Sequence, residues 1–337
     1  MSDREVLLAF SGGIDSTAAV AILREAGFQV AALTLGMTDD RDFESRVRQQ
    51  AKRLSIPLHF RSVAARFGRE VIDYFTEAYR TGRTPVPCTV CNSRIKWPEL
   101  LTEADRLGIP FLATGHYFRI TEYNSKYYVT RARDERKDQS YYLWNIPQEV
   151  LRRTVAPMGE RIKRELAAEH PGMRESMGIC FLGGMKCRDF LRLRLPGLRP
   201  GAVVDTSGRT IGCHEGAALY TIGQRKGLGL PEGMSVVAVD TESNRLVAGS
   251  DALLRRYVLE LGGCRLVDCG EVFDAGDVRA VIRGVGRNPE GPVRIAPTRT
   301  GLRIELTDPA WAPAVGQAVV LYRGDRVVAG GFLERAE

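Results

Sequence analysis

The stretch Ser11-Gly-Gly-Ile-Asp-Ser-Thr17 lies between an apolar run at 5–10 and an Ala-rich run at 16–26. The first run predicts a buried strand, and the second predicts a helix that Gly27 ends. Two adjacent glycines let the backbone turn tightly and present successive N–H groups, and the positive end of a helix favours an oxyanion. Hydroxyl groups at Ser11, Ser16 and Thr17 add hydrogen-bond donors. The stretch therefore predicts a phosphate-binding loop.

This loop differs from the Walker type. It has no Gly-Lys-Ser/Thr, so it supplies no lysine of its own for a terminal phosphate. Its acidic residue, Asp15, is suited to hold Mg²⁺ that screens the phosphates. The sequence thus predicts a site for a nucleotide and Mg²⁺.

The first half of the chain alternates strand and helix patterns. Apolar runs at 28–35, 56–60 and 109–114 predict further strands, whereas 43–54, 66–79 and 93–107 have helical periodicity. Such alternation predicts an α/β fold, a doubly wound parallel sheet of the Rossmann-like type with helices on both faces. Gly115-His116 follows the last strand, where such a sheet places its ligand crevice.

The pattern changes after about residue 195. Pro-Gly pairs are followed by short β-like segments, which we expect at 202–205, 210–213, 217–221, 235–240, 245–248, 279–285, 293–296, 302–307, 318–323 and 327–333. This pattern predicts a small β-rich domain and then a C-terminal β-barrel. We expect domain boundaries at 1–196 for the ATP-binding catalytic domain, 197–258 for the central β domain and 259–337 for the barrel.

Composition restricts the class of protein. The chain has 337 residues, 44% hydrophobic and 26% charged, which is typical of a globular protein of more than one domain. We find no apolar run long enough for a membrane span and no signal-peptide pattern at the N-terminus, so we expect a cytoplasmic protein without a membrane partner. The seven cysteines are then expected as thiols, and the net charge of +7 is compatible with a polyanionic partner.

Three cysteines stand in segments suited to chemistry. Cys88-Thr-Val-Cys91 lies close to Arg94 and Lys96, and Cys180 follows Gly178-Ile179. Nearby cations favour the thiolate, so we expect Arg94 and Lys96 to lower the thiol pKa. The remaining thiols at Cys213, Cys264 and Cys269 are expected in the cores of the β domains.

Several segments, in order along the chain, carry a resemblance to a known family. They are Ser11-Gly-Gly-Ile-Asp-Ser16, Gly82-Arg-Thr-Pro85, Cys91-Asn-Ser-Arg-Ile-Lys-Trp97, Ala113-Thr-Gly-His-Tyr117, Lys137-Asp-Gln-Ser-Tyr-Tyr-Leu143, Met177-Gly-Ile-Cys-Phe-Leu182, Arg188-Asp-Phe-Leu191 and Leu219-Tyr-Thr-Ile-Gly-Gln-Arg-Lys-Gly-Leu-Gly229. With these segments the chain resembles the tRNA-specific 2-thiouridylases (the MnmA type), within the superfamily of pyrophosphate-loop ATP pyrophosphatases.

The resemblance implies an activity and a set of site residues. It implies ATP-dependent thiolation of tRNA at wobble uridine 34, in which the C2 carbonyl oxygen is adenylated and sulfur then displaces AMP. Cys180 matches the persulfide-carrying cysteine and Cys91 its partner nucleophile. The implied ATP contacts are Ala9, Phe10, Ser11, Gly12, Gly13, Ile14, Asp15, Ser16, Met37 and Gly115. The implied tRNA contacts are His116, Lys137, Asp138, Gln139 and Gln317. The implied sulfur donor is a cysteine desulfurase, a sulfur-relay protein or sulfide.

One departure from the family pattern leaves the sulfur chemistry open. The family has Asn-Pro-Asp where this chain has Val86-Pro87-Cys88. In one mechanism Cys180 carries a persulfide that Cys91 resolves. In the other, Cys88, Cys91 and Cys180 hold a 4Fe–4S cluster whose open iron delivers sulfur, as in related thiolases. Alternatively, Cys88 is a small buried apolar residue, or the thiols bind zinc with Cys187 as fourth ligand.

Two other functions compete with thiolation. One is a synthetase of the same superfamily acting on a small molecule, which would not require cysteines around the site. The other is a non-catalytic module that binds ATP or RNA. Basic clusters at 131–137, 161–164, 186–194 and 223–227 favour an RNA partner when taken together.

Overall fold

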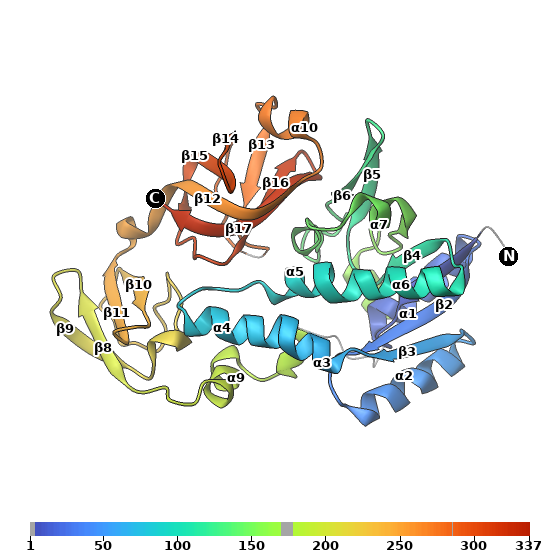
Figure 1. The fold of residues 1–337 in the computed structure, drawn as a ribbon, viewed down its shortest axis with the longest axis horizontal. Coiled ribbons are helices and arrows are strands. Elements are labelled where there is room, and N and C mark those ends of the chain that lie inside the picture. The colour runs from blue at the N-terminus through green and yellow to red at the C-terminus, as the bar shows by residue number, and fades with distance from the viewer. Residues whose placement is uncertain (1–3, 170–177, 285) are drawn as a thin grey trace. The chain divides into compact units, whose positions relative to one another are not determined.

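The computed structural model describes residues 4–169, 178–284 and 286–337 (Figure 1). The chain forms two compact units. The first comprises Met1–Ile72, Cys88–Phe181 and Asp325–Val327, and the second comprises Asp73–Pro87, Leu182–Gly324 and Val328–Glu337. Within the described ranges, no helix is long and apolar enough to cross a membrane. The domain boundaries expected from the sequence remain predictions.

The first unit is built on a parallel sheet. Its strands are β1 (Glu5–Ala9), β2 (Gln29–Gly36), β3 (Leu58–Ser62), β4 (Phe111–Thr114) and β7 (Thr154–Val155), in the order β3-β2-β1-β4-β7. All neighbouring pairs are parallel, which confirms the predicted doubly wound α/β sheet. Because the chain moves outward from β1 in one direction and returns on its other side with β4, the carboxyl ends of β1 and β4 mark the topological switch point of the sheet.

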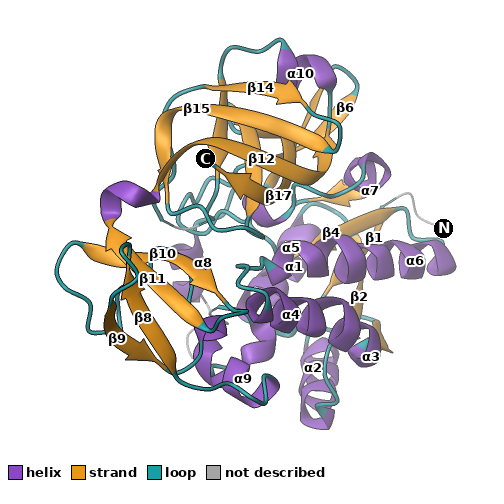
Figure 2. Cartoon of the chain, turned by 60° about the vertical axis from the view of Figure 1, so that its left-hand side comes forward, coloured by secondary structure: helices purple, strands orange, loops and turns teal. Residues whose placement is uncertain are grey.

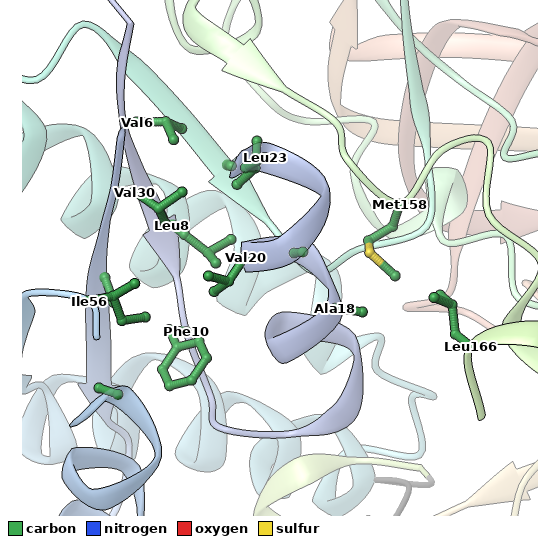
Figure 3. Packing of buried hydrophobic residues seen from close by; sticks show 14 of the residues in the cluster. Val6, Leu8, Phe10, Ala18, Val20, Leu23, Val30, Ile56, Met158 and Leu166 are labelled. Atoms are coloured by element: carbon green, nitrogen blue, oxygen red, sulfur yellow. The ribbon is translucent and has the colours of Figure 1, made fainter. Parts of the chain in front are cut away.

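One face of this sheet packs against α1 (Ile14–Glu25) and α2 (Arg41–Arg53). Side chains alternate along a strand, so Val6 and Leu8 of β1 point to the same face. There they meet Val20 and Leu23 of α1 in a buried apolar cluster (Figure 3). The cluster also includes Leu166 of α8 (Lys163–Glu169), a helix that contacts α1.

The segment between β3 and β4 is largely helical and carries the CxxC motif. Its elements are α3 (Ala64–Phe67), a π-helix (Gly68–Asp73), α4 (Tyr74–Arg80), α5 (Pro87–Cys91), a π-helix (Asn92–Lys96) and α6 (Trp97–Leu107). The helices predicted at 66–79 and 93–107 are present but begin earlier. Pro87 begins α5, a position where its missing N–H leaves no helical hydrogen bond unmade. The helix continues to Cys91, so both cysteines of the motif lie on it. Contacts of α6 with β1 and β4 cover the second face of the sheet.

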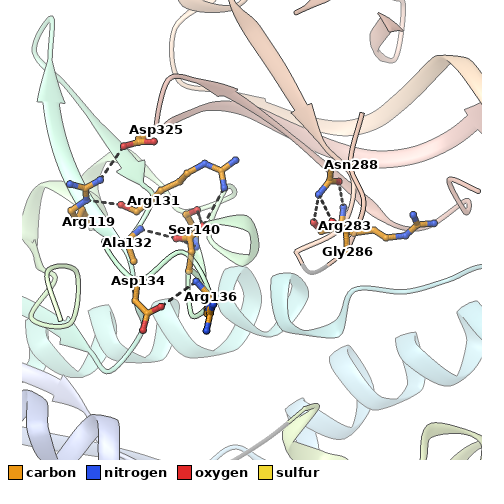
Figure 4. Close-up of polar contacts among 11 residues, drawn as sticks. Arg119, Arg131, Ala132, Asp134, Arg136, Ser140, Arg283, Gly286, Asn288 and Asp325 are labelled. Atoms are coloured by element: carbon orange, nitrogen blue, oxygen red, sulfur yellow. Dashed lines mark hydrogen bonds and ion pairs between the residues drawn. The ribbon is translucent and has the colours of Figure 1, made fainter. Parts of the chain in front are cut away.

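A hairpin between β4 and α7 (Gln148–Arg153) is absent from the sequence prediction. Strands β5 (Arg119–Tyr123) and β6 (Lys126–Thr130) join through Asn124 and Ser125, which both have positive φ. Two left-handed residues are what a tight hairpin turn requires, and asparagine tolerates that region well. Arg119 of β5 donates to the carboxylate of Asp325 at 3.1 Å (Figure 4). This bond connects the hairpin to the short C-terminal segment that belongs to the first unit.

The second unit is rich in β structure, as predicted (Figure 2). Four strands form a sheet in the order β10-β11-β8-β9: β8 (Gly201–Asp205), β9 (Thr210–His214), β10 (Met234–Asp240) and β11 (Arg245–Ser250). The strand predicted at 217–221 is wrong. Ala217–Leu219 is a 3₁₀-helix whose three residues are all buried, and a short apolar run does not by itself distinguish the two structures.

The C-terminal strands follow the order β13-β16-β17-β12-β15-β14. They are β12 (Arg255–Leu266), β13 (Val278–Val281), β14 (Val293–Pro297), β15 (Gly301–Trp311), β16 (Ala318–Arg323) and β17 (Arg326–Ala336), with α10 (Cys269–Phe273) after β12. The sequence predicts β14 and β16 closely but misses β12. That strand contains Gly262 and Gly263, which weaken a strand pattern, and the register of its pairing shifts there.

Gly115→Ala tests the close approach of β4 to α1. A Cβ at Gly115 would stand 3.1 Å from the backbone nitrogen of Ser16, which cannot move without disturbing the phosphate loop. We expect the free energy of unfolding to fall by about 1–3 kcal/mol in urea titrations, as for other overpacked sites.

The matched control is Gly68→Ala. Gly68 has φ −53°, and a Cβ there would meet no atom of the described residues within 4 Å, so alanine fits without strain. We expect this change to stabilise the protein by roughly 0.4–1 kcal/mol. Equal destabilisation by both substitutions would contradict the interpretation that the space at Gly115 is specifically required.

Candidate functional site

The phosphate loop has the geometry that its sequence predicts. It leaves β1 at Phe10, whose N–H donates to Leu33 at 2.8 Å, and it turns at Gly12, where φ is +72°. The hydroxyl of Ser16 donates to the carbonyl of Gly13 at 3.1 Å and accepts from the N–H of Ser11 at 3.3 Å. These two bonds tie the loop to the first turn of α1, so a hydrogen-bonded turn connects the strand and the helix.

The start of α1 retains unused donors. Gly13 is the N-cap and has no side chain to accept from the first N–H groups of the helix, so in the described part of the chain no N-cap side chain competes with an anion for them. The hydroxyl oxygen of Thr17 is buried and has no hydrogen-bond partner among the described residues. An orphaned donor beside uncapped helix N–H groups fits a phosphate ligand. The predicted contacts Ala9 to Ser16 run from the end of β1 through this turn into α1, whereas Met37 and Gly115 follow other strands of the sheet.

Asp15 is held by two donors. The hydroxyl of Tyr117 donates to its Oδ1 at 2.8 Å, and the ammonium of Lys163 donates to the same oxygen at 2.5 Å. The side chain of Lys163 is 7% exposed, whereas that of Asp15 is 34% exposed. The sequence singles out Lys163 only as part of the basic cluster at 161–164. Nothing near it in the chain indicates a contact with the loop, because the two lie far apart in the sequence.

Gly115 and His116 connect the loop to the cysteines. Gly115 follows β4 and packs against the backbone of Ser16. Nδ1 of the next residue, His116, lies 2.8 Å from Oγ1 of Thr114, and its Nε2 lies 3.2 Å from Nζ of Lys96. Burial, followed by the charge of Lys96, lowers the pKa of His116 well below its usual value. A neutral His116 therefore donates from Nδ1 and accepts from the ammonium at Nε2.

The thiols of Cys88 and Cys91 lie on one face of α5, because residues three apart on a helix are neighbours. Burial raises the pKa of both, that of Cys91 to about 11, and the charge of Lys96 opposes the rise. The predicted lowering of the thiol pKa is therefore wrong, because desolvation outweighs the single cation. Arg94 is exposed and is not among the charges that act on these thiols.

Cys180 belongs to the same electrostatic neighbourhood. It begins a 3₁₀-turn, Cys180–Leu182, and it is exposed. Burial is the main reason that the pKa of Cys88 and Cys91 is raised, and a negative charge on Cys180 adds to the rise, so Cys180 lies near enough for its charge to act on both thiols. Phe181 packs edge-on against Phe67 with ring centroids 5.9 Å apart, which anchors the turn. Met177, from the same motif, lies outside the described residues.

The other thiols differ from expectation. Cys213 and Cys269 are exposed and Cys264 is half-buried, so the prediction that all three are core residues is wrong. Strand residues alternate between faces, and Cys213 of β9 points outward. In the described part of the chain, no three His, Cys, Asp or Glu side chains converge closely enough to hold a single metal ion, which leaves the suggested zinc site unsupported.

The residues predicted to contact tRNA are ordered by internal bonds. Asp138 accepts from the N–H of Ala132 at 2.9 Å and from the hydroxyl of Ser140 at 2.7 Å. The side chain of Gln139 accepts from the N–H of Tyr117 at 3.0 Å, which ties this segment to the residue that contacts Asp15. Lys137 is half-buried at the turn before them. Their role toward RNA stays a prediction.

Met37 and Gln317 are the remaining predicted contacts with ATP and tRNA. Met37 follows the last residue of β2 and is half-buried at the same carboxyl edge of the sheet as the loop. Gln317 lies in the second unit, where its side chain accepts from the N–H of Ala314 at 2.8 Å. These positions leave the proposed contacts with ATP and tRNA as predictions.

Comparison with known proteins identifies the family. Family models match three consecutive segments: a tRNA methyl transferase HUP domain at 4–184, a tRNA methyl transferase PRC-barrel domain at 188–250 and an aminomethyltransferase beta-barrel domain at 271–333. A tRNA-specific 2-thiouridylase of Moorella thermoacetica is 41% identical over 97% of this chain and 99% of its own length. The chain belongs to the tRNA-specific 2-thiouridylase family.

Other family members match over the same extent. The relative from Chloroflexus aggregans is 39% identical over 98% of this chain and 99% of its own length, and one from Phocaeicola vulgatus is 36% identical over 98% of each. The family models carry methyl transferase names although these relatives are called 2-thiouridylases. The first model nevertheless spans the phosphate loop, the CxxC motif and Cys180 as one domain.

The raised pKa of Cys91 predicts a pH profile for alkylation. With a pKa of about 11, about one Cys91 in ten thousand is a thiolate at pH 7. We therefore expect its rate of reaction with iodoacetamide to rise about tenfold per pH unit between pH 7 and pH 10, measured by mass spectrometry of the Cys91 peptide.

Lys96→Met provides the comparison for this measurement. Because the ammonium opposes the effect of burial, its removal should move the profile of Cys91 to still higher pH. Urea-unfolded protein, in which the thiol is solvated, gives the reference profile. A plateau for folded wild-type protein below pH 9 would contradict the dominance of burial.

Proposed function

We propose that this protein catalyses the ATP-dependent thiolation of tRNA and forms 2-thiouridine at wobble uridine 34. The relatives' names support the tRNA substrate and the position of the sulfur. The net charge of +7 agrees with a polyanionic partner. ATP is the co-substrate, and Asp15 at the start of α1 is the residue that would hold Mg²⁺, which would screen the phosphate charges when bound.

One observation carries the proposal. The phosphate loop and the cysteines are joined by a short chain of contacts within one compact unit. Gly115 packs on the loop, and His116 bonds to Lys96, whose charge acts on Cys88 and Cys91. A site that only binds nucleotide has no need of thiols at this edge. A synthetase for a small molecule has no need of them either.

The loop supports adenylation as the first step. The C2 carbonyl oxygen of the uridine attacks the α-phosphorus of ATP, and pyrophosphate leaves from the uncapped end of α1, where N–H groups stabilise its charge. The adenylated oxygen then becomes a good leaving group as AMP. The parallel sheet keeps the loop in place, so little of the site needs to reorganise.

The cysteines support sulfur transfer as the second step. Cys180 is exposed, as a residue that receives sulfur from a donor must be, and it carries the terminal sulfur as a persulfide. That sulfur attacks C2 and AMP leaves. Cys91 then attacks the Sγ of Cys180, which breaks the sulfur–sulfur bond, releases thiouridine and forms a disulfide between Cys91 and Cys180. An external reductant restores both thiols. In this route the donor is a cysteine desulfurase or a relay protein, whose own persulfide passes its outer sulfur to the Cys180 thiolate and leaves as a thiol.

Cys88 gives the sulfur step a second candidate route. Three thiols from α5 and the Cys180 turn match the donor set of a 4Fe–4S cluster with one iron left open. Cys88, Cys91 and Cys180 would hold this cluster, and its open iron would supply sulfide. The sulfurs around a cubane stand further apart than the ligands of a single ion, so the absence of a single-ion site in the described residues is no argument against it.

Cys91→Ala and Cys180→Ala test the proposal. Each variant should lose 2-thiouridine formation with a cysteine desulfurase, cysteine, ATP and tRNA, measured by mass spectrometry of nucleosides. Each should retain tRNA-dependent release of pyrophosphate within a few-fold, because adenylation precedes sulfur transfer. Cys269→Ala, at an exposed thiol of the second unit, is the matched control and should leave both measurements unchanged.

Two outcomes would contradict this scheme. If Cys91→Ala and Cys180→Ala both still form 2-thiouridine, these two cysteines do not carry out the sulfur transfer. Absence of pyrophosphate release by wild-type protein with tRNA would remove adenylation itself and favour the non-catalytic binding module.

Cys88→Ser separates the two sulfur routes. In the cluster route, anaerobically purified wild-type protein contains iron and absorbs near about 400 nm, and the variant loses both the iron and the activity. In the persulfide route, iron-free protein is active and Cys88→Ser remains active. An active, colourless, iron-free wild-type enzyme would rule out the cluster.

A further inference from the structure

A buried ammonium lies beside the phosphate loop. Lys163 is 7% exposed, and its Nζ is 2.5 Å from Oδ1 of Asp15. The same ammonium lies 6.0 Å from the centre of the ring of Tyr117, whose hydroxyl also bonds to Oδ1. Loop, tyrosine and lysine all belong to the first unit.

Stability alone does not account for a lysine at this position. Moving an ammonium out of water costs several kcal/mol, and a buried pair often contributes no net stability. The positive end of the dipole of α1 also repels a cation, and Asp15 is in the first turn of that helix. The site therefore combines one carboxylate with an ammonium, a helix N-terminus and uncapped N–H groups. This surplus of positive charge suits an anion.

The lysine is presented rigidly and the pair is open on one side. The backbone N–H of Lys163 donates to Asp134 at 2.9 Å, which fixes the first residue of α8. Leu166, one turn later, is buried in the apolar cluster against α1. The side chain of Asp15 is 34% exposed, so the ion pair lies at the edge of solvent and not in the interior of the unit.

We propose that Lys163 is the phosphate-binding lysine that the loop sequence lacks. The fold supplies from α8 the cation that a Walker loop carries within its own sequence. In the free protein Asp15 pairs with the ammonium, and in the complex the ammonium donates to phosphate oxygens of ATP. The inference rests on the proposed use of ATP and does not depend on the thiolation of tRNA.

Binding measurements with Lys163→Met test this role. Titration calorimetry with Mg²⁺ and α,β-methylene ATP should show affinity lowered about 10- to 100-fold, the effect of losing a hydrogen bond to a charged group. Adenosine, which has no phosphate, should bind the variant and the wild type equally. Lys163→Arg keeps the charge and should recover most of the affinity. Arg164→Met, at the exposed neighbouring residue, should bind the ATP analogue like wild type.

A double variant distinguishes ligand binding from a structural role. Lys163→Met alone leaves Asp15 without its counter-ion and could unfold the loop. We therefore compare Asp15→Asn with Asp15→Asn combined with Lys163→Met, in which neither protein holds an unpaired carboxylate. If Lys163 binds phosphate, the double variant binds the ATP analogue at least about tenfold more weakly than Asp15→Asn.

Two results would overturn the inference. One is equal affinity of Asp15→Asn and the double variant for the ATP analogue, which would make Lys163 a counter-ion alone. The other is an equal loss of affinity for adenosine and the ATP analogue, which would indicate a general collapse of the site. Failure of thiolation with intact, Lys163-dependent binding of the analogue would count against the proposed function and leave this inference standing.

Discussion

The site depends on one steric constraint, the close approach of the end of β4 to the first turn of α1. Gly115 allows it, because any Cβ would press on the backbone of Ser16. The approach is a consequence of the strand order, in which β1 lies between β2 and β4 and the chain reverses direction at the switch point. Since β4 is held against the loop, the residues after it are held close to the loop as well.

Because of that constraint, the short segment after β4 contacts both the phosphate loop and a residue beside the cysteines. Tyr117 reaches back to Asp15 beside the loop, and His116 reaches Lys96 beside the cysteines. Gln139 bonds with the backbone of Tyr117 and holds the segment from the other side. A small displacement of β4 would therefore disturb the nucleotide end and the thiol end together.

The sequence predicts the local parts of this arrangement well. The loop, the parallel sheet and the CxxC motif each depend on residues close together in the chain, so spacing and chemistry reveal them. Lys163 and the hairpin at Asn124 show the limits. The lysine meets Asp15 only in the folded chain, so its sequence neighbours do not indicate this contact. The hairpin is not predicted because its turn residues stand between strands of mixed polarity. The pKa of Cys91 depends on burial, which no charge pattern in the sequence expresses.

The phosphate end and the thiol end of the site differ in the charged groups that they carry. The phosphate end carries N–H groups without a side-chain cap, a buried ammonium and a carboxylate, the groups that the proposed binding of ATP would use. At the thiol end, burial keeps Cys91 protonated at neutral pH, and a neutral thiol is a poor nucleophile. In the proposed reaction this asymmetry suits adenylation before sulfur transfer, because the thiol would stay unreactive while the loop binds the phosphates. Cys91 then needs an acceptor for its proton when the sulfur–sulfur bond is cleaved, and the charge of Lys96 is the feature that lowers the free energy of that step.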